Sequence, residues 1–168
     1  MLMNNRPPFY MIVLAPLWTA LLATGFAQQP QLEGNKAVVR KVFTEILSQG
    51  NYAVANEIYA PDFVNHTATK DVALEQDQAS ARGWRTAFPD LEMTIEKEIA
   101  EGDLVTVLWK GHGTNTGNGN GINATGKTAD GRGISIFRVV NGKIKEEWTE
   151  YDQLLLMRQL GLMQAASR

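Results

Sequence analysis

The sequence predicts an α+β fold in which helices come first and an antiparallel sheet follows. Up to Ala87, apolar residues recur with the spacing of amphipathic helices. From Leu91 onward they alternate with polar residues, which is the period of a half-buried strand. The dipeptide Asn141-Gly142 separates two such stretches and indicates a β-hairpin, because a type I′ turn needs positive φ at both central residues.

We expect three helices, four strands and a last short helix. Residues 35–48 carry an apolar stripe that ends near Gly50, a second helix ends before Pro61, and a third ends at Phe88-Pro89. The expected helices cover residues 35–48, 51–59, 71–87 and 152–160, and the expected strands cover 91–99, 104–112, 134–139 and 144–151. Residues 63–67 are expected to be extended.

Residues 1–27 have the pattern of a signal peptide. Arg6 supplies a positive charge, residues 11–24 are uncharged and mostly apolar, and Gly25 and Ala27 are the small residues of a cleavage site. We therefore expect export to the periplasm or the medium after cleavage near Ala27. The alternative is an uncleaved anchor over residues 11–27, although this apolar run is short of the ~20 residues of a membrane span.

The remainder is expected to form one domain. Residues 28–34 are predicted to be a polar lead-in, 35–163 the domain and 164–168 a tail. The chain has no cysteine, which excludes disulfides and thiolate nucleophiles. Its net charge of −2 argues against nucleic acid as a partner, since phosphate binding needs a basic patch. With only two histidines, far apart, no metal site is expected.

One motif suggests a nucleotide site that its context excludes. Residues 121–128 (GINATGKT) match the phosphate-binding pattern G-x-x-x-x-G-K-[ST]. That loop works only when a buried strand leads into it and a helix follows, whose N-terminus receives the phosphate. Here the next residues, Ala129-Asp130-Gly131-Arg132-Gly133, cannot open a helix. The sequence therefore predicts no nucleotide binding.

Six short motifs occur in the order found in SnoaL-like polyketide cyclases. They are Phe88-Pro89-Asp90-Leu91, Glu101-Gly102-Asp103-Leu104-Val105, Gly113-Thr114-Asn115-Thr116-Gly117, Thr125-Gly126-Lys127, Gly142-Lys143-Ile144 with Glu147-Trp148, and Gln159-Leu160-Gly161. The chain resembles this family from Asn35 to Gly161. The resemblance implies the nuclear transport factor 2-like cone, in which helices close over a curved antiparallel sheet around a central pocket. It also implies cofactor-free chemistry and frequent dimers or higher oligomers.

The resembled cyclases close a ring by aldol condensation, in which a base removes a proton next to a carbonyl and polar donors stabilise the enolate. Their acidic residue falls at Thr149 here and a histidine falls at Ser135, so both usual groups are replaced. Asn65, a pocket residue of the cyclases, matches. The family's Gly-Thr-His becomes Gly113-Thr114-Asn115.

Three other residues are candidates for acid/base chemistry. His66 follows Asn65, and its ordinary pKa of ~6.5 suits either role, or it is a structural histidine bonded to backbone. Asp152 ends the last strand and either faces the cavity or caps the helix that follows. Glu147 shares the strand face of Thr149, and it is either functional with a raised pKa or at the rim. We predict His66 and Asp152 as catalytic and expect Glu147 at the rim.

The expected ligand is a small apolar molecule. The residues predicted to bind it are Asn65, Trp84, Asn115, Ser135, Phe137 and Thr149. The sequence leaves two functions open: a small exported enzyme of the lyase, isomerase or cyclase kind acting on a carbonyl compound, or a non-catalytic binding module. Strand alternation places Trp148 on the outer face with Ile134 and Ile136, an exposed apolar patch that a homodimer would cover.

Overall fold

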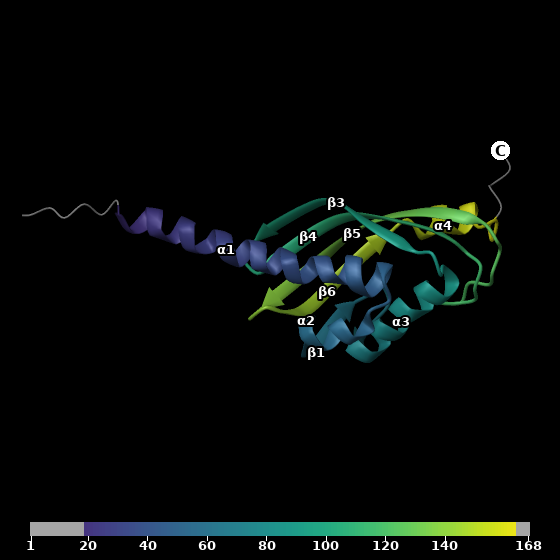
Figure 1. Ribbon diagram of the computed structural model, residues 1–168, viewed down its shortest axis with the longest axis horizontal. Helices are drawn as coiled ribbons and strands as arrows, with labels where there is room; N and C mark the ends of the chain where they lie inside the picture. The colour runs from purple at the N-terminus through teal and green to yellow at the C-terminus, as the bar shows by residue number, and fades with distance from the viewer. Residues whose placement is uncertain (1–18, 164–168) are drawn as a thin grey trace, which may run out of the picture.

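A curved six-stranded sheet forms the body of the structure, a computed structural model that describes residues 19–163 (Figure 1). Its strand order is β2-β1-β6-β5-β4-β3. The strands are β1 (Tyr59–His66), β2 (Asp71–Ala73), β3 (Glu92–Glu101), β4 (Leu104–Thr114), β5 (Thr128–Val140) and β6 (Lys143–Tyr151). The predicted hairpin is confirmed, because Asn141 and Gly142 join β5 to β6 with φ values of 52° and 72°.

The sheet is mixed rather than wholly antiparallel. β1 runs parallel to β6, whereas the other neighbours pair antiparallel. The prediction of an antiparallel sheet was wrong at this one pairing, since alternation of apolar residues carries no information about strand direction. As a result β6 is an interior strand, with hydrogen-bonded partners on both sides.

The first helix is longer than predicted. Helix α1 spans Thr19–Lys41 and continues directly into a π-helical segment, η1 (Val42–Ser48). Figure 1 shows α1 running along the sheet, with its N-terminal part extending beyond the strands. The predicted polar lead-in over residues 28–34 lies within this helix, and its placement before the domain stays a prediction. That stretch lacks an apolar stripe, but its Gln, Leu and Glu residues are good helix formers.

The predicted signal peptide lies largely outside the described residues, because the description begins at Thr19. The expected cleavage site near Ala27 falls within α1. Export and cleavage stay predictions. No helix in the described part of the chain is both long and apolar enough to cross a membrane.

The remaining helices differ modestly from the prediction. The second comprises a short 3₁₀ turn, η2 (Tyr52–Val54), and α2 (Ala55–Ile58). Helix α3 spans Leu74–Ala87, three residues shorter at its start than predicted, because Asp71–Ala73 pairs with β1 as β2. The last helix, α4, spans Gln153–Gln159.

The helices pack on the inner face of the sheet and enclose the core. The principal cluster joins the end of α1, η1, α2 and the inner-facing residues of β4, β5 and β6. Its most buried members include Val39, Phe43, Ile46, Ile58, Val105, Val107, Phe137 and Ile144. A second cluster unites the end of α3 with α4 and the loop before β5, through Ala87, Phe88, Ile122, Ala129, Leu156 and Leu160.

Asn115 holds together the long loop between β4 and β5. Its side chain is 0% exposed and donates to the carbonyl oxygens of Ala87 (3.1 Å) and Gly117 (3.0 Å). Its Oδ1 accepts from the amide (2.9 Å) and the hydroxyl (3.0 Å) of Thr125. The side chain of Asn115 thus fixes the loop over residues 121–128, whose sequence resembles a phosphate-binding motif. This loop leads into strand β5 and not into a helix, as its sequence context predicts.

We expect Asn115→Ala to lower the free energy of unfolding by about 3 kcal/mol, because it leaves buried backbone groups without partners. Chemical denaturation measures this change. The control is Asn123→Ala, an exposed asparagine in the same loop, for which we expect a change within about 0.5 kcal/mol. Equal stability of the two variants would contradict this role for Asn115.

Candidate functional site

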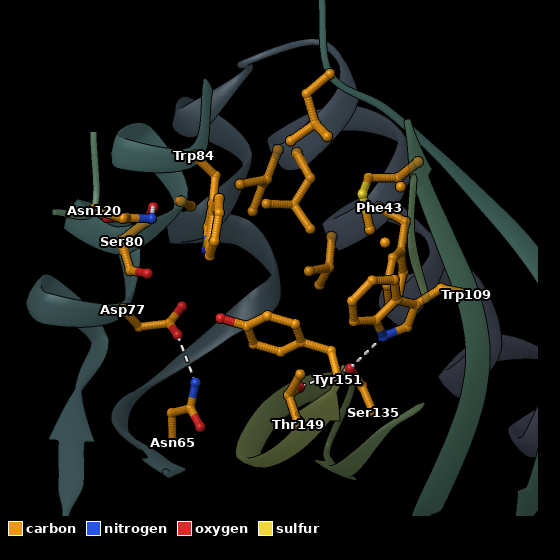
Figure 2. Close-up of a pocket in the computed structure, with 18 of the residues that line it drawn as sticks. Phe43, Asn65, Asp77, Ser80, Trp84, Trp109, Asn120, Ser135, Thr149 and Tyr151 are labelled. Carbon is orange, nitrogen blue, oxygen red and sulfur yellow. Dashed lines mark hydrogen bonds between the residues drawn. The ribbon is translucent and has the colours of Figure 1, made fainter. Parts of the chain in front are cut away.

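A cavity of about 960 Å³ lies between the helices and the inner face of the sheet. Figure 2 shows residues of α3 on one side and of β4, β5 and β6 on the other. Its walls are largely aromatic and aliphatic and include Phe43, Tyr59, Trp84, Phe88, Trp109, Phe137 and Tyr151. An apolar cavity with a few polar groups is the usual form of a small-molecule site.

Glu147 is the most unusual polar group in this cavity. It lies on β6, lines the cavity and is only 9% exposed. Burial raises the pKa of Glu147 from 4.5 to about 8, and the nearby charge of Asp77 contributes in the same direction. A hydrogen bond from Thr149 opposes the shift. The expectation that Glu147 lies at the rim was wrong. Its burial and raised pKa agree with the other alternative from the sequence, a buried carboxyl group whose pKa is raised.

A chain of hydrogen bonds connects Glu147 to Trp109 along the sheet side of the cavity. Trp109 Nε1 donates to Ser135 Oγ (2.9 Å), and Ser135 Oγ lies 2.7 Å from Thr149 Oγ1. Thr149 Oγ1 donates to Glu147 Oε1 (2.9 Å). Because Thr149 uses its single hydrogen on Glu147, Ser135 must donate to Thr149. The chain therefore presents Oε1 of Glu147 with a donor and leaves Oε2 as the oxygen that can carry a proton.

A second carboxyl group enters the cavity from α3. Asp77 Oδ1 accepts from Asn65 Nδ2 (2.8 Å), a bond drawn in Figure 2. Burial raises the pKa of Asp77, while hydrogen bonds from Asn65 and Gln78 oppose the change. The pKa of buried Tyr59 is also raised well above its usual value, mainly by burial and further by the charges of Glu147 and Asp77. Two carboxyl groups thus share one apolar space.

Tyr151 adds a third polar group. Figure 2 shows its phenol ring reaching into the cavity, between Trp84 on one side and Trp109 on the other. The ring centroids lie 6.1 Å from Trp84 and 6.4 Å from Trp109. Burial raises the pKa of Tyr151, so its hydroxyl stays protonated and can donate a hydrogen bond near neutral pH.

Five of the six residues predicted to bind the ligand line the cavity: Asn65, Trp84, Ser135, Phe137 and Thr149. The sixth, Asn115, is not part of the lining, because all its polar atoms are bonded within the β4–β5 loop. Sequence alternation indicated which side chains of β5 and β6 face inward. It could not distinguish a buried asparagine that binds a ligand from one that fixes a loop.

His66, predicted to be catalytic, lies on the other face of the sheet. Asn65 faces the cavity, so the next residue on the strand faces away from it. The ring of His66 stacks on Trp148 at 4.7 Å between centroids and an angle of 17°. Its Nδ1 lies 2.9 Å from Asp71 Oδ1. This position does not support the catalytic role that the sequence suggested for His66.

Asp152, the other predicted catalyst, caps α4. Its Oδ1 accepts a hydrogen bond from the amide of Leu155 (2.8 Å), and the residue is exposed and does not line the cavity. This is the structural alternative that the sequence left open. In its place the site contains Asp77 and Gln78, which the sequence analysis missed. In the sequence, the acidic residues of α3 have the pattern of an ordinary solvent-exposed helix face. They can be recognised as site residues only when it is known which strand packs against α3.

The sequence matches one known protein family, and the structure matches several solved structures. The profile of the SnoaL-like polyketide cyclases matches residues 37–160. The chain belongs to this family. No match was found among curated proteins.

Several solved structures share the fold of this chain. A polyketide cyclase candidate from Jannaschia sp. CCS1 is 25% identical with a TM-score of 0.72, over 79% of this chain and 94% of that one. AclR from Streptomyces galilaeus is 22% identical with a TM-score of 0.73, over 82% and 87%. IdmH from Streptomyces antibioticus is 24% identical with a TM-score of 0.68, over 76% and 98%. The expected cone-shaped α+β fold is confirmed.

The raised pKa of Glu147 predicts a pH-dependent stability. The folded protein retains this proton up to about pH 8, whereas the unfolded chain releases it near 4.5. The stabilisation is complete below the lower value and is lost as the pH rises through the higher one. We expect the free energy of unfolding to fall by at most about 1.4 kcal/mol per pH unit within this window.

Glu147→Gln, which resembles the protonated acid, should flatten this dependence. Denaturation measured at several pH values tests it. Glu146→Gln, the neighbouring carboxyl on the opposite face of β6, should keep the slope of the unmodified protein. Parallel profiles for Glu147→Gln and the unmodified protein would show that Glu147 is ionised normally.

Proposed function

We propose that the protein is an acid/base enzyme that removes a proton next to a carbonyl group of a small apolar compound, in a reaction of the cyclase or isomerase kind. The observation that supports this most is the pair Asp77 and Glu147 in one largely apolar cavity. Burial raises the pKa of both groups, and two carboxyl groups that repel each other in one site cannot both ionise easily, so one holds a proton while the other is a carboxylate. Membership of the SnoaL-like family agrees with this class of reaction.

The two carboxyl groups take different roles near neutral pH. Glu147, with its pKa of about 8, is the proton donor, and Asp77 is the base. Asp77 takes the proton from the carbon next to the carbonyl, and the C–H electron pair moves into a carbon–carbon double bond. The carbonyl oxygen takes the proton of Glu147, which gives a neutral enol. The enol then attacks a second carbonyl of the same molecule or, where it is conjugated, takes a proton at the far carbon of the conjugated system. Protonated Asp77 gives its proton to the new alkoxide or to that carbon, and Glu147 takes back the proton of the enol oxygen.

The other polar residues position these groups and the substrate. The chain from Trp109 through Ser135 to Thr149 fixes Oε1 of Glu147, so that Oε2 delivers the proton. Asn65 orients Asp77 with its 2.8 Å bond. The hydroxyl of Tyr151 is available as a second donor to the carbonyl oxygen. Aromatic side chains such as Trp84 supply apolar surface for the rest of the substrate.

The proposal predicts exchange of protons next to a carbonyl. In deuterated water, 1-tetralone and other small cyclic ketones should gain deuterium at the carbon beside the carbonyl, followed by mass spectrometry. Asp77→Asn and Glu147→Gln should each reduce the rate about 100-fold or more, the typical contribution of general acid/base groups. Glu146→Gln, on the outer face, is the matched control and should leave the rate unchanged.

The same experiment separates the enzyme from a binding module. If these ketones bind saturably but exchange deuterium no faster than in buffer alone, the enzymatic proposal is contradicted and a non-catalytic carrier is favoured. Exchange that survives in both Asp77→Asn and Glu147→Gln would place the chemistry elsewhere in the protein.

We also propose that two copies pair through the outer face of the sheet. Ile99, Thr106, Ile136 and Trp148 form one row across β3, β4, β5 and β6. Ile134 and Ile136 are 48% and 37% exposed, which is unusual for neighbouring isoleucines. Arg132, Arg138, Glu146 and Glu150 border the row, so the face carries both signs of charge and can pair with a copy of itself.

Ile136→Lys should convert a dimer into a monomer, because it places a charge in the centre of the apolar row. Light scattering after gel filtration measures the mass. Leu154→Lys changes an equally exposed leucine on α4 and should leave the dimer intact. A monomeric unmodified protein at micromolar concentration, or a dimer that persists in Ile136→Lys, would contradict the proposed interface.

Export remains part of the proposal. The charge, the apolar run and the small residues of positions 1–27 support a cleaved leader, which places the proposed chemistry outside the cytoplasm. The alternative is attachment to a membrane by residues 11–27.

A further inference from the structure

The carbonyl oxygen of Gln78 is a buried acceptor that nothing in the described chain satisfies. Gln78 lies on α3, lines the cavity and is 6% exposed. Its Oε1 has no hydrogen-bond partner among residues 19–163. A buried acceptor without a partner costs about 1–3 kcal/mol, so native proteins rarely retain one without a reason.

The neighbouring carboxylate fixes the orientation of the amide. Gln78 Nε2 lies 3.4 Å from Asp77 Oδ2, and Asp77 Oδ1 is held by Asn65. Both oxygens of Asp77 act as acceptors in these contacts, so turning the amide over would set two acceptor oxygens against each other. The amide nitrogen therefore stays beside Asp77, and the unpartnered oxygen is the part of Gln78 that remains for a ligand.

The cavity thus offers opposite polarity on its two sides. On the α3 side, Gln78 presents an acceptor, while Asn65 is occupied with Asp77. On the β6 side, Glu147 and Tyr151 present donors in the proposed function. A ligand that matches both sides has an acceptor at one position and a donor at another, separated by apolar surface that faces rings such as Trp84.

We propose that Gln78 Oε1 accepts a hydrogen bond from a hydroxyl or N–H group of the ligand, so that the site selects carbonyl compounds that also carry a donor. The position of the carbonyl rests on the proposed function, whereas the contact with Gln78 rests only on its buried, unpartnered oxygen. A site built around a buried acceptor discriminates against analogues that lack the donor, because binding them leaves that acceptor without a partner.

Three matched ligands test the proposal without turnover. They are 7-hydroxy-1-tetralone, which has a donor, 1-tetralone, which has none, and 7-methoxy-1-tetralone, which has only an acceptor at that position. Calorimetric titration at neutral pH should show the hydroxyl compound binding about tenfold or more tightly than the other two, the ratio that ~1.4 kcal/mol produces.

Gln78→Met keeps the length of the side chain and removes the acceptor, together with the long 3.4 Å contact from Nε2 to Asp77. In this variant we expect the three ligands to bind within about threefold of one another, a spread well below the tenfold that 1.4 kcal/mol represents. The control, Gln76→Met, lies exposed on the same helix and should keep the preference of the unmodified protein. Because the substitution removes an unsatisfied group, its unfolding midpoint should not fall, which confirms that the variant is folded.

Several outcomes would overturn the proposal: equal affinity of the unmodified protein for the hydroxyl compound and 1-tetralone, the same preference in Gln78→Met, or no saturable binding of any of the three ligands. Failure of the proposed chemistry is distinguishable, since it appears as absent deuterium exchange. A preference for the hydroxyl compound that disappears in Gln78→Met supports the contact with Gln78 even then.

Discussion

The site depends on a carboxyl group held in an apolar cavity. Burying an ionised carboxylate is costly, so the protein keeps Glu147 protonated over most of the physiological range. The position of Glu147 is fixed by the sheet rather than by a loop. Its strand pairs with Phe137 of β5 on one side and with Asn65 of β1 on the other. This interior location prevents the strand from moving the carboxyl group towards solvent.

Two local irregularities shape the space around this group. The register of β6 shifts between its pairings with Val139 and Arg138, so that both Ile144 and Glu147 face inward. On the opposite wall the π-helical segment η1 contributes Phe43, Ile46 and Leu47 to the cavity. Such widened helical turns frequently occur at functional sites. The bulge and the widened turn together leave room for a ligand where regular elements would fill the core.

Sequence patterns predicted most of the fold and about half of the site. Alternation along β5 and β6 placed Ser135, Phe137 and Thr149 on the inner face, because strand geometry is strictly periodic. The same periodicity should have excluded His66, since Asn65 beside it faces the cavity. Asp77 and Gln78 were beyond the reach of local patterns. They become site residues only because α3 packs across β1, a contact between segments separated in sequence.

Ser135 and Thr149, which stand where the family usually has a histidine and an acid, belong to the same hydrogen-bonded chain as the buried Glu147. In the resembled cyclases an acidic residue is expected where this chain has Thr149, and a histidine where it has Ser135. Here those two hydroxyl groups lie 2.7 Å apart and lead to Glu147, two residues earlier on the same strand face. Two residues along a strand correspond to about 7 Å. Compared with the usual position in the resembled cyclases, the acid of this chain thus lies nearer to β1 and α3, and the hydroxyl group of Thr149 at the usual position supports it with a hydrogen bond. In the proposed function, the reacting atoms of the substrate would accordingly lie nearer to β1 and α3 than an acid at Thr149 would place them.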